Sequence, residues 1–124
     1  MRRVLVVDGA NVVGARPDGW WKDRAGAARR LHEGLMTADV DVDEVVLVLE
    51  GGAKAGVRAG RDGDVRTVHA ARDGDAEIAR QVADAVADGA GSRVTVVTAD
   101  RALQARVTHL GALAVGPAWL LDRM

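Results

Sequence analysis

The chain has 124 residues, of which 48% are hydrophobic, and a formal net charge of −1 at pH 7. This length predicts one domain, over residues 1–124, with a full core. The absence of cysteine excludes disulfides and thiolate metal sites, and the charge argues against gross non-specific nucleic-acid binding but allows a local basic stripe. No segment approaches the roughly 20 apolar residues of a membrane span, and the N-terminus is unlike a signal peptide. We therefore expect a cytoplasmic protein without membrane association.

The first half of the chain alternates apolar runs with segments rich in turn-forming residues. An apolar run at 4–8 predicts a buried strand that ends in an aspartate. Residues 9–22 contain three glycines and a proline, which predicts a loop, and the spacing at 23–37 predicts a helix. A second buried strand is expected at 45–49. The glycine-rich segment 51–63 predicts a mobile crossover with little regular structure.

The second half of the chain continues the alternation of strands and helices. In chain order, the sequence predicts a strand at 65–69, a helix at 75–88 ended by Gly89 and Gly91, a strand at 94–98, a helix at 100–110, a short strand at 113–115 and a last helix beginning at Pro117. Strands separated by helices in this way form a parallel sheet with helices on both faces.

Aspartates lie where buried strands and a helix meet the expected edge of this sheet. Asp8 ends the first strand, Asp100 follows the fourth strand, and Asp75 stands in the acidic start of the helix before that strand. The carboxyl ends of parallel strands form the edge at which open α/β sheets bind ligands. Neighbouring carboxylates repel one another, and a hard divalent cation removes that repulsion. Because only oxygen ligands are offered, the sequence predicts Mg²⁺ or Mn²⁺ at these three acids.

A purely structural role is open to each of these residues. Asp8 can cap a turn, and Asn11 can form an Asx turn as well as act in a site. Helix capping suits Asp73 better than Asp75, and it also remains open for Asp100. The sequence alone therefore favours a shared site without excluding local capping.

Three motifs together resemble the NYN branch of the PIN-like nuclease superfamily, most closely its YacP-like group. They are the strand and turn V-D-G-A-N-V-V-G at 7–14, the acidic helix start G-D-A-E-I at 74–78 and the strand with turn V-V-T-A-D-R at 96–101. The resemblance covers essentially the whole chain. It implies an α/β fold, a Rossmann-like PIN/NYN domain whose five-stranded parallel sheet has the order 3-2-1-4-5, with helices on both faces.

The resemblance also implies an activity, which is metal-dependent hydrolysis of RNA phosphodiester bonds. On that basis Asp8, Asp75 and Asp100 hold Mg²⁺ or Mn²⁺, and Asn11 orients the catalytic site. The ribonuclease is expected to be endonucleolytic on single-stranded or loop RNA and to leave a 5′-phosphate.

The chain departs from the pattern of this family at three positions. Arg101 follows Asp100 where many relatives carry a further acid nearby, Ala76 follows Asp75 where the acid is often doubled, and Glu50 stands where many relatives have aspartate. These differences leave two alternatives open. One is a weak or inactive RNA-binding NYN module, and the other is a phosphoesterase of the nucleotide pyrophosphohydrolase type.

Basic and aromatic side chains near the predicted site are candidates for RNA contacts. A basic crossover beside an acidic metal site suits a phosphodiester backbone, although a solvated surface loop explains any single residue equally well. An exposed tryptophan can stack on an unpaired base, and we expect one tryptophan of the adjacent pair to be packed and the other exposed. The predicted RNA-binding residues are Lys54, Arg58, Arg61, Arg72, Arg101, Trp20 and Trp21.

Overall fold

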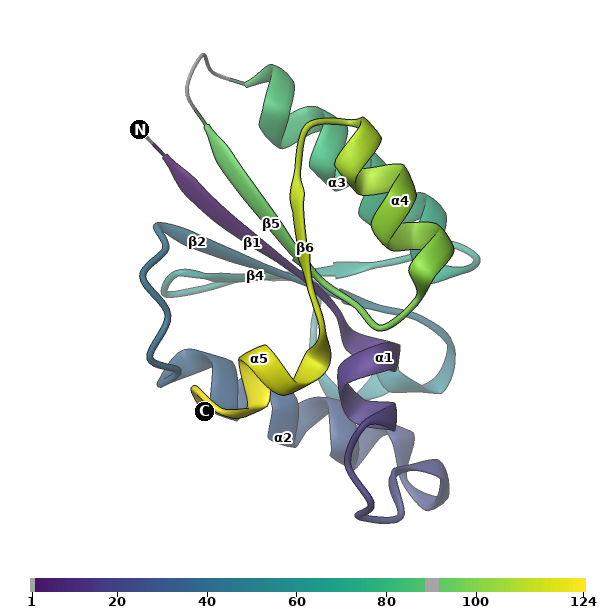
Figure 1. Ribbon diagram of the computed structural model, residues 1–124. Helices are drawn as coiled ribbons and strands as arrows, with labels where there is room; N and C mark the ends of the chain where they lie inside the picture. Colours follow the sequence, from purple (N-terminus) through teal and green to yellow (C-terminus); the bar gives the residue numbers. More distant parts are fainter. Residues whose placement is uncertain (1, 89–91) are drawn as a thin grey trace.

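A six-stranded sheet forms the centre of the protein in a computed structural model that describes residues 2–88 and 92–124 (Figure 1). Its order is β3-β4-β2-β1-β5-β6. The strands are β1 (Arg3–Asp8), β2 (Glu44–Leu49), β3 (Gly60–Asp62), β4 (Val65–His69), β5 (Arg93–Val97) and β6 (Leu113–Val115). The five predicted strands are confirmed, in the implied order and all parallel. The sheet differs from the prediction in its sixth strand, β3, which pairs antiparallel with β4 at one edge.

Helices cover both faces of the sheet (Figure 1). The helices are α1 (Gly9–Gly14), α2 (Arg24–Met36), α3 (Gly74–Ala87), α4 (Arg101–His109) and α5 (Pro117–Leu121), with 3₁₀ turns η1 (Trp20–Lys22) and η2 (Gly51–Gly56). One core cluster joins the strands to α3 and α4, and the other joins them to α1, α2 and α5. Across the described residues, every helix is too short or too polar to span a bilayer.

Alternate residues of the central strands serve these two cores. In β1, Val4 and Val6 belong to the cluster with α3 and α4, whereas Leu5 and Val7 belong to the cluster with α1, α2 and α5. Successive side chains of a strand point to opposite faces. Burial on both faces therefore explains why these strands are continuous apolar runs rather than alternating patterns.

The prediction of a loop at 9–22 is wrong, because α1 begins directly after β1 and η1 follows it. This abrupt start depends on Gly9, where a Cβ would lie 2.6 Å from the carbonyl oxygen of Val48. The helix predicted at 23–37 is confirmed as α2, with Asp23 as its N-cap. The helix predicted at 75–88 begins at Gly74, and its expected end at Gly89 and Gly91 lies outside the described residues.

The prediction of an irregular crossover at 51–63 is also wrong, because this segment forms η2 and β3. Gly56 explains part of the error. A Cβ at this position would lie 2.0 Å from the carbonyl oxygen of Ala25, so glycine lets η2 pack directly on the backbone of α2. Here glycine marks a close approach between two backbones, which a local sequence pattern does not distinguish from a flexible linker.

Candidate active site

Asp8 lies at the carboxyl end of β1, next to the end of β5. The two strands pair up to Val7 and Val97, which places Asp8 beside Thr98. Asp8 is only 3% exposed, and its Oδ2 accepts hydrogen bonds of 2.8 Å from Asn11 Nδ2 and from the Thr98 hydroxyl. Its Oδ1 accepts a longer bond of 3.4 Å from the Asn11 backbone N–H. One carboxylate oxygen is therefore held by two short hydrogen bonds, and the other is held weakly.

Asn11 and Thr98 connect Asp8 to the turn that precedes α4. Asn11 Oδ1 accepts a hydrogen bond from the Ala99 N–H at 3.2 Å, and Thr98 Oγ1 accepts one from the Asp100 N–H at 3.2 Å. Asn11, which lies in α1, therefore orients Asp8 and holds the sequence-distant turn between β5 and α4. Sequence reasoning did not single out Thr98, although its place at the end of the neighbouring parallel strand is a usable signal.

Asp100 lies at the start of α4 and is its N-cap. Its Oδ1 accepts a hydrogen bond of 3.0 Å from the Leu103 N–H. Gln104 Nε2 donates to the Thr98 carbonyl at 2.7 Å and holds the turn between β5 and α4. The capping role that the sequence left open is thus present, and Oδ2 of Asp100 forms no hydrogen bond within the described residues.

Three further acids surround the start of α3. Glu50 Oε2 accepts a hydrogen bond of 2.6 Å from the Gly74 N–H, and Asp73 caps the helix through the Ala76 N–H at 3.0 Å. Asp73 is therefore the cap, as expected. Asp75 is partly buried and makes no side-chain hydrogen bond within residues 2–88 and 92–124. No firm role for Glu50 could be predicted from the sequence, because its contact with α3 depends on tertiary structure.

These residues form one electrostatic unit, which we call the acid cluster: Asp8, Glu50, Asp73, Asp75 and Asp100. Burial raises the pKa of Asp8, although hydrogen bonds from Thr98 and Asn11 act in the opposite direction. Burial also raises the pKa of Asp75, and repulsion from Asp100, Asp8, Asp73 and Glu50 raises it further. Among the described residues, no basic side chain forms an ion pair with any member of the cluster.

The acid cluster offers oxygen ligands alone, which suits Mg²⁺ or Mn²⁺. The three predicted ligands Asp8, Asp75 and Asp100 are not preformed as a coordination cage, because no three acidic or histidine side chains of the described residues are arranged to hold one ion. Mg²⁺ commonly uses one or two protein carboxylates together with waters and substrate phosphates. The cluster therefore fits a weakly held hard cation and does not fit a closed three-carboxylate site.

The two adjacent tryptophans differ in exposure, and Trp20 shares a cavity with Glu50 of the acid cluster. Trp20 is half-buried and Trp21 is 58% exposed, which confirms the expectation of one packed and one available ring. Their rings meet edge to face at a centroid distance of 6.1 Å, and the Arg24 guanidinium lies 5.3 Å from the Trp20 centroid. Trp20 lines a cavity of about 260 Å³, the Trp20 pocket, whose walls include Gly9, Ala10, Trp20, Arg24, Glu50 and Arg72.

The predicted basic RNA-binding residues are not gathered in one place. Arg72 is exposed in the wall of the Trp20 pocket, and Arg101 is exposed next to Asp100. Lys54 instead donates to the Ala70 carbonyl at 3.1 Å, and the exposed Arg58 belongs to neither group. Arg61 pairs with Glu44, at the far end of β2 and roughly 16 Å along the strand from the acid cluster. A single basic stripe at 54–72 is therefore not present.

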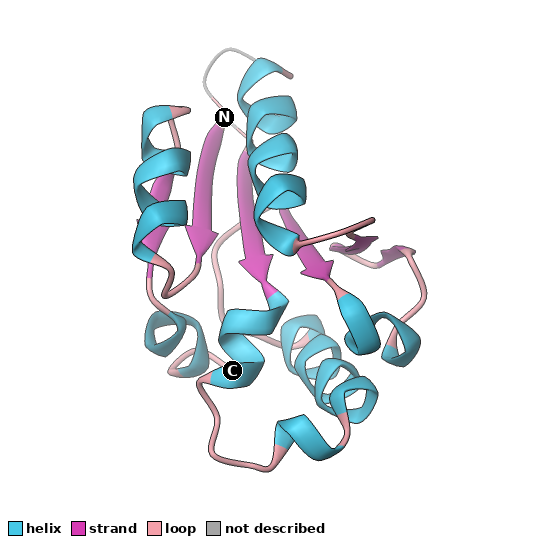
Figure 2. Cartoon of the chain, turned by 90° about the vertical axis from the view of Figure 1, so that its right-hand side faces the viewer, coloured by secondary structure: helices cyan, strands magenta, loops and turns pink. Residues whose placement is uncertain are grey.

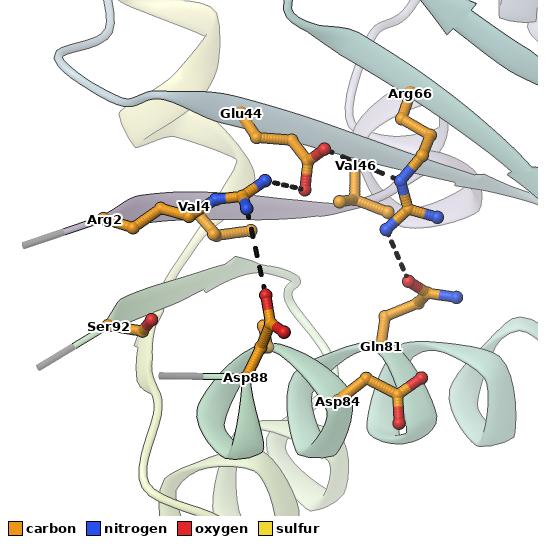
Figure 3. Close-up of a pocket in the computed structure, with 10 residues that line it drawn as sticks. Arg2, Val4, Glu44, Val46, Arg66, Gln81, Asp84, Asp88 and Ser92 are labelled. Atoms are coloured by element: carbon orange, nitrogen blue, oxygen red, sulfur yellow. Dashed lines mark hydrogen bonds and ion pairs between the residues drawn. The ribbon is translucent and has the colours of Figure 1, made fainter. Parts of the chain in front are cut away.

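The amino end of the sheet contains a second cavity, of about 230 Å³ (Figure 3). Glu44 is 5% exposed there and forms ion pairs with Arg2, Arg61 and Arg66. Arg66 also donates to Gln81 Oε1 at 2.9 Å, which joins the sheet to α3. This network neutralises a buried carboxylate and ties secondary-structure elements together. Because the parallel strands all point away from this end (Figure 2), it is separate from the acid cluster.

Comparison with known proteins supports the fold. No family model and no curated protein matches the sequence. The structure is similar to the crystal structure of a tryptophan-to-leucine mutant of Rae1 (YacP) from Bacillus subtilis, with a TM-score of 0.65 and 18% sequence identity. The similarity covers 98% of this chain and 74% of that chain. The protein therefore has a YacP-like α/β fold.

Proposed function

We propose that this protein is a metal-dependent ribonuclease that hydrolyses phosphodiester bonds in single-stranded or loop RNA. The observation that carries this proposal is the acid cluster, which stands without a cationic partner among the described residues. A carboxylate as buried as Asp8 is costly unless it is compensated. The cluster also lies where open α/β sheets bind ligands, in a fold shared with YacP.

In this proposal Asp8, Asp75 and Asp100 would hold Mg²⁺ or Mn²⁺ as an open site, in which waters and the RNA phosphate supply the remaining ligands. When bound, the cation polarises the scissile phosphate and lowers the pKa of a bound water. Asn11 and Thr98 keep the Asp8 carboxylate in one orientation through their hydrogen bonds to Oδ2. Pre-orientation of this kind reduces the reorganisation that the site must undergo during reaction.

The basic side chains beside the cluster serve the substrate in this proposal. Arg72 and Arg101 are exposed next to the acids, and their guanidinium groups match the geometry of phosphate oxygens. They would fix the RNA backbone on either side of the scissile bond. We expect a 5′-phosphate on the product.

A non-catalytic RNA-binding module is the second candidate. It is favoured by the lack of a preformed three-ligand group within the described part of the chain. The same tryptophans and arginines would bind RNA in that case, without turnover.

The test is incubation of the purified protein with end-labelled single-stranded RNA in Mn²⁺, Mg²⁺ or EDTA. We expect cleavage with either metal and no cleavage in EDTA. The new 5′ end of the product should carry a phosphate group, which a phosphatase releases as inorganic phosphate. Asp100→Asn should lose cleavage but keep the fold, because asparagine caps helices as well as aspartate does.

Three outcomes separate the candidates. Cleavage that persists in EDTA would contradict the metal mechanism. RNA binding without cleavage in any metal would favour the non-catalytic module. Hydrolysis of free nucleotides while RNA stays intact would favour a nucleotide pyrophosphohydrolase.

A further inference from the structure

We propose that the Trp20 pocket binds one unpaired guanine base of an RNA strand whose backbone crosses the acid cluster. This inference rests on the proposed function, because it names part of the substrate of that site. The pocket and the cluster share Glu50, and Gly9 in the pocket wall directly follows Asp8. A base in the pocket therefore lies next to the phosphate that the acids would act on.

The walls of the pocket are built by short elements that pack tightly at the end of the sheet. Gly9 begins α1 so close to β2 that a Cβ would collide with the Val48 carbonyl oxygen. Gly51 begins η2 with a φ of +55°, and no atom lies within 4 Å of the position of its missing Cβ. The wall at Gly9 is thus fixed by close backbone contact, whereas open space lies beside Gly51.

The size and the aromatic wall of the pocket suit a single planar base. Its volume of about 260 Å³ is just below the range of roughly 300–1,000 Å³ that is usual for larger ligands. The Arg24 guanidinium lies over the Trp20 ring, 5.3 Å from its centroid, and the Trp21 ring stands perpendicular to it at 6.1 Å; both contacts position Trp20. Stacking on an aromatic ring that is already positioned requires little further ordering, and unpaired RNA bases are commonly bound in this way.

Glu50 supplies the feature that distinguishes one base from another. Its Oε2 is engaged by the Gly74 N–H, which orients the carboxylate, and its Oε1 has no hydrogen-bond partner among the residues that the structure describes. An ionised carboxylate only accepts hydrogen bonds. The base it prefers must therefore present N–H donors to it.

Guanine matches this arrangement best. Its Watson–Crick edge presents two adjacent N–H groups beside a carbonyl oxygen, so Glu50 can accept from the former while a guanidinium of Arg72 or Arg24 donates to the latter. Adenine and cytosine carry an unprotonated ring nitrogen next to their amino group. This nitrogen would face the Glu50 carboxylate, and because both groups are acceptors, no hydrogen bond would form between them. Uracil has a single N–H between two carbonyls.

The test is binding of short RNA to the wild-type protein in EDTA, where the proposed cleavage does not occur. Three heptamers of uridine carry a central guanosine, adenosine or uridine, and binding is followed by fluorescence anisotropy at low salt. We expect the heptamer with guanosine to bind about tenfold more tightly than the other two, a typical discrimination for one base read by paired hydrogen bonds.

Matched variants locate the preference in the pocket. Trp20→Leu and Glu50→Gln should remove the guanosine preference, whereas Asp84→Asn, at an exposed acid beside the cavity at the amino end of the sheet, should keep it. Thermal melting confirms that each variant is folded. If Glu50→Gln unfolds because its bond to Gly74 is lost, Arg72→Gln provides a second variant, and we expect it to weaken the preference.

Several results would overturn the inference. Equal binding of the three heptamers, no binding of any of them, or loss of the preference in Asp84→Asn would each do so. If RNA is still cleaved in Mn²⁺ in that case, the ribonuclease proposal stands without the guanine pocket. If guanosine is preferred but no metal supports cleavage, the pocket stands and the ribonuclease proposal fails.

Discussion

Glu44 and Asp8 are both buried carboxylates, at opposite ends of the neighbouring strands β2 and β1, and their surroundings differ in charge. Glu44, at the amino end, is paired with Arg2, Arg61 and Arg66. Asp8, at the carboxyl end, is hydrogen-bonded only to the neutral Asn11 and Thr98, and its electrostatic neighbours are further acids.

This difference agrees with a structural role for the amino end of the sheet and with the ligand site that we propose at the carboxyl end. Removing a carboxylate from water costs free energy, and cationic partners offset much of that cost. At the amino end the chain supplies these partners itself. At the carboxyl end they are missing from the described residues, and the pKa of Asp8 and of Asp75 is raised. Neighbouring groups with perturbed pKa values are typical of functional sites.

The largest expected effect is on catalysis at the carboxyl end. Asp8→Asn keeps the shape of the side chain and removes its charge, and it should lower the rate of RNA cleavage at least about 100-fold, the order of loss for one electrostatic group in an active site. Asp84→Asn, an exposed acid in the wall of the other cavity, is the control and should stay within about twofold. Single-turnover cleavage rates measure both, and similar rates for the two variants would remove the functional distinction between the ends.

The next effect is on stability at the amino end. Glu44→Gln leaves Arg2, Arg61 and Arg66 without their common carboxylate, and it should lower the free energy of unfolding by about 2 kcal/mol. The loss should be smaller than for a fully buried pair, because the arginine side chains are 34–53% exposed. Urea denaturation measures the change, and the cleavage rate should be retained. An unchanged urea midpoint would mean that the arginine network is not needed for folding.

A smaller effect is expected from divalent cations. If Mn²⁺ binds the acid cluster of the folded state only, a concentration ten times its Kd should stabilise the protein by about 1.4 kcal/mol. Glu44→Gln should keep this stabilisation, and Asp8→Asn should lose most of it. Thermal melts with and without Mn²⁺ test this, and a stabilisation of equal size in both variants would place the cation outside the acid cluster.

The smallest effect concerns the pH dependence of stability through Asp75. Its pKa is raised in the folded protein, so between the unfolded and folded values the folded state binds more protons, and stability falls as the pH rises. At neutral pH the ionised Asp75 therefore destabilises the fold. Asp75→Asn should raise the melting temperature at pH 7, and the gain should disappear as the pH falls below the ordinary aspartate value of about 3.9. A variant that melts below the wild type at pH 7 would show that repulsion within the cluster is already relieved.

The sequence by itself determined the parts of this protein that depend on local pattern. Continuous Val and Leu runs predicted β1, β2 and β5 to within a residue at each end, because strands buried on both faces need no polar alternation. Apolar spacing predicted α2, and the acid at the end of β1 marked the ligand-binding edge of the sheet. The strand order followed from the family resemblance rather than from any local pattern.

Only the tertiary structure decided the features that join distant segments. The Thr98 hydroxyl reaches Asp8 across 90 residues of sequence, and this contact depends on the register between β1 and β5. The sequence around Gly56 suggested a linker, because the reason for glycine at this position is close contact with the backbone of α2, which lies far away in the sequence. Arg61 was assigned to the wrong end of the sheet because β3 turns back antiparallel and carries it to Glu44. Local sequence propensity indicates which residues can form a helix or a strand. Contacts between helices and strands depend instead on how the whole chain packs.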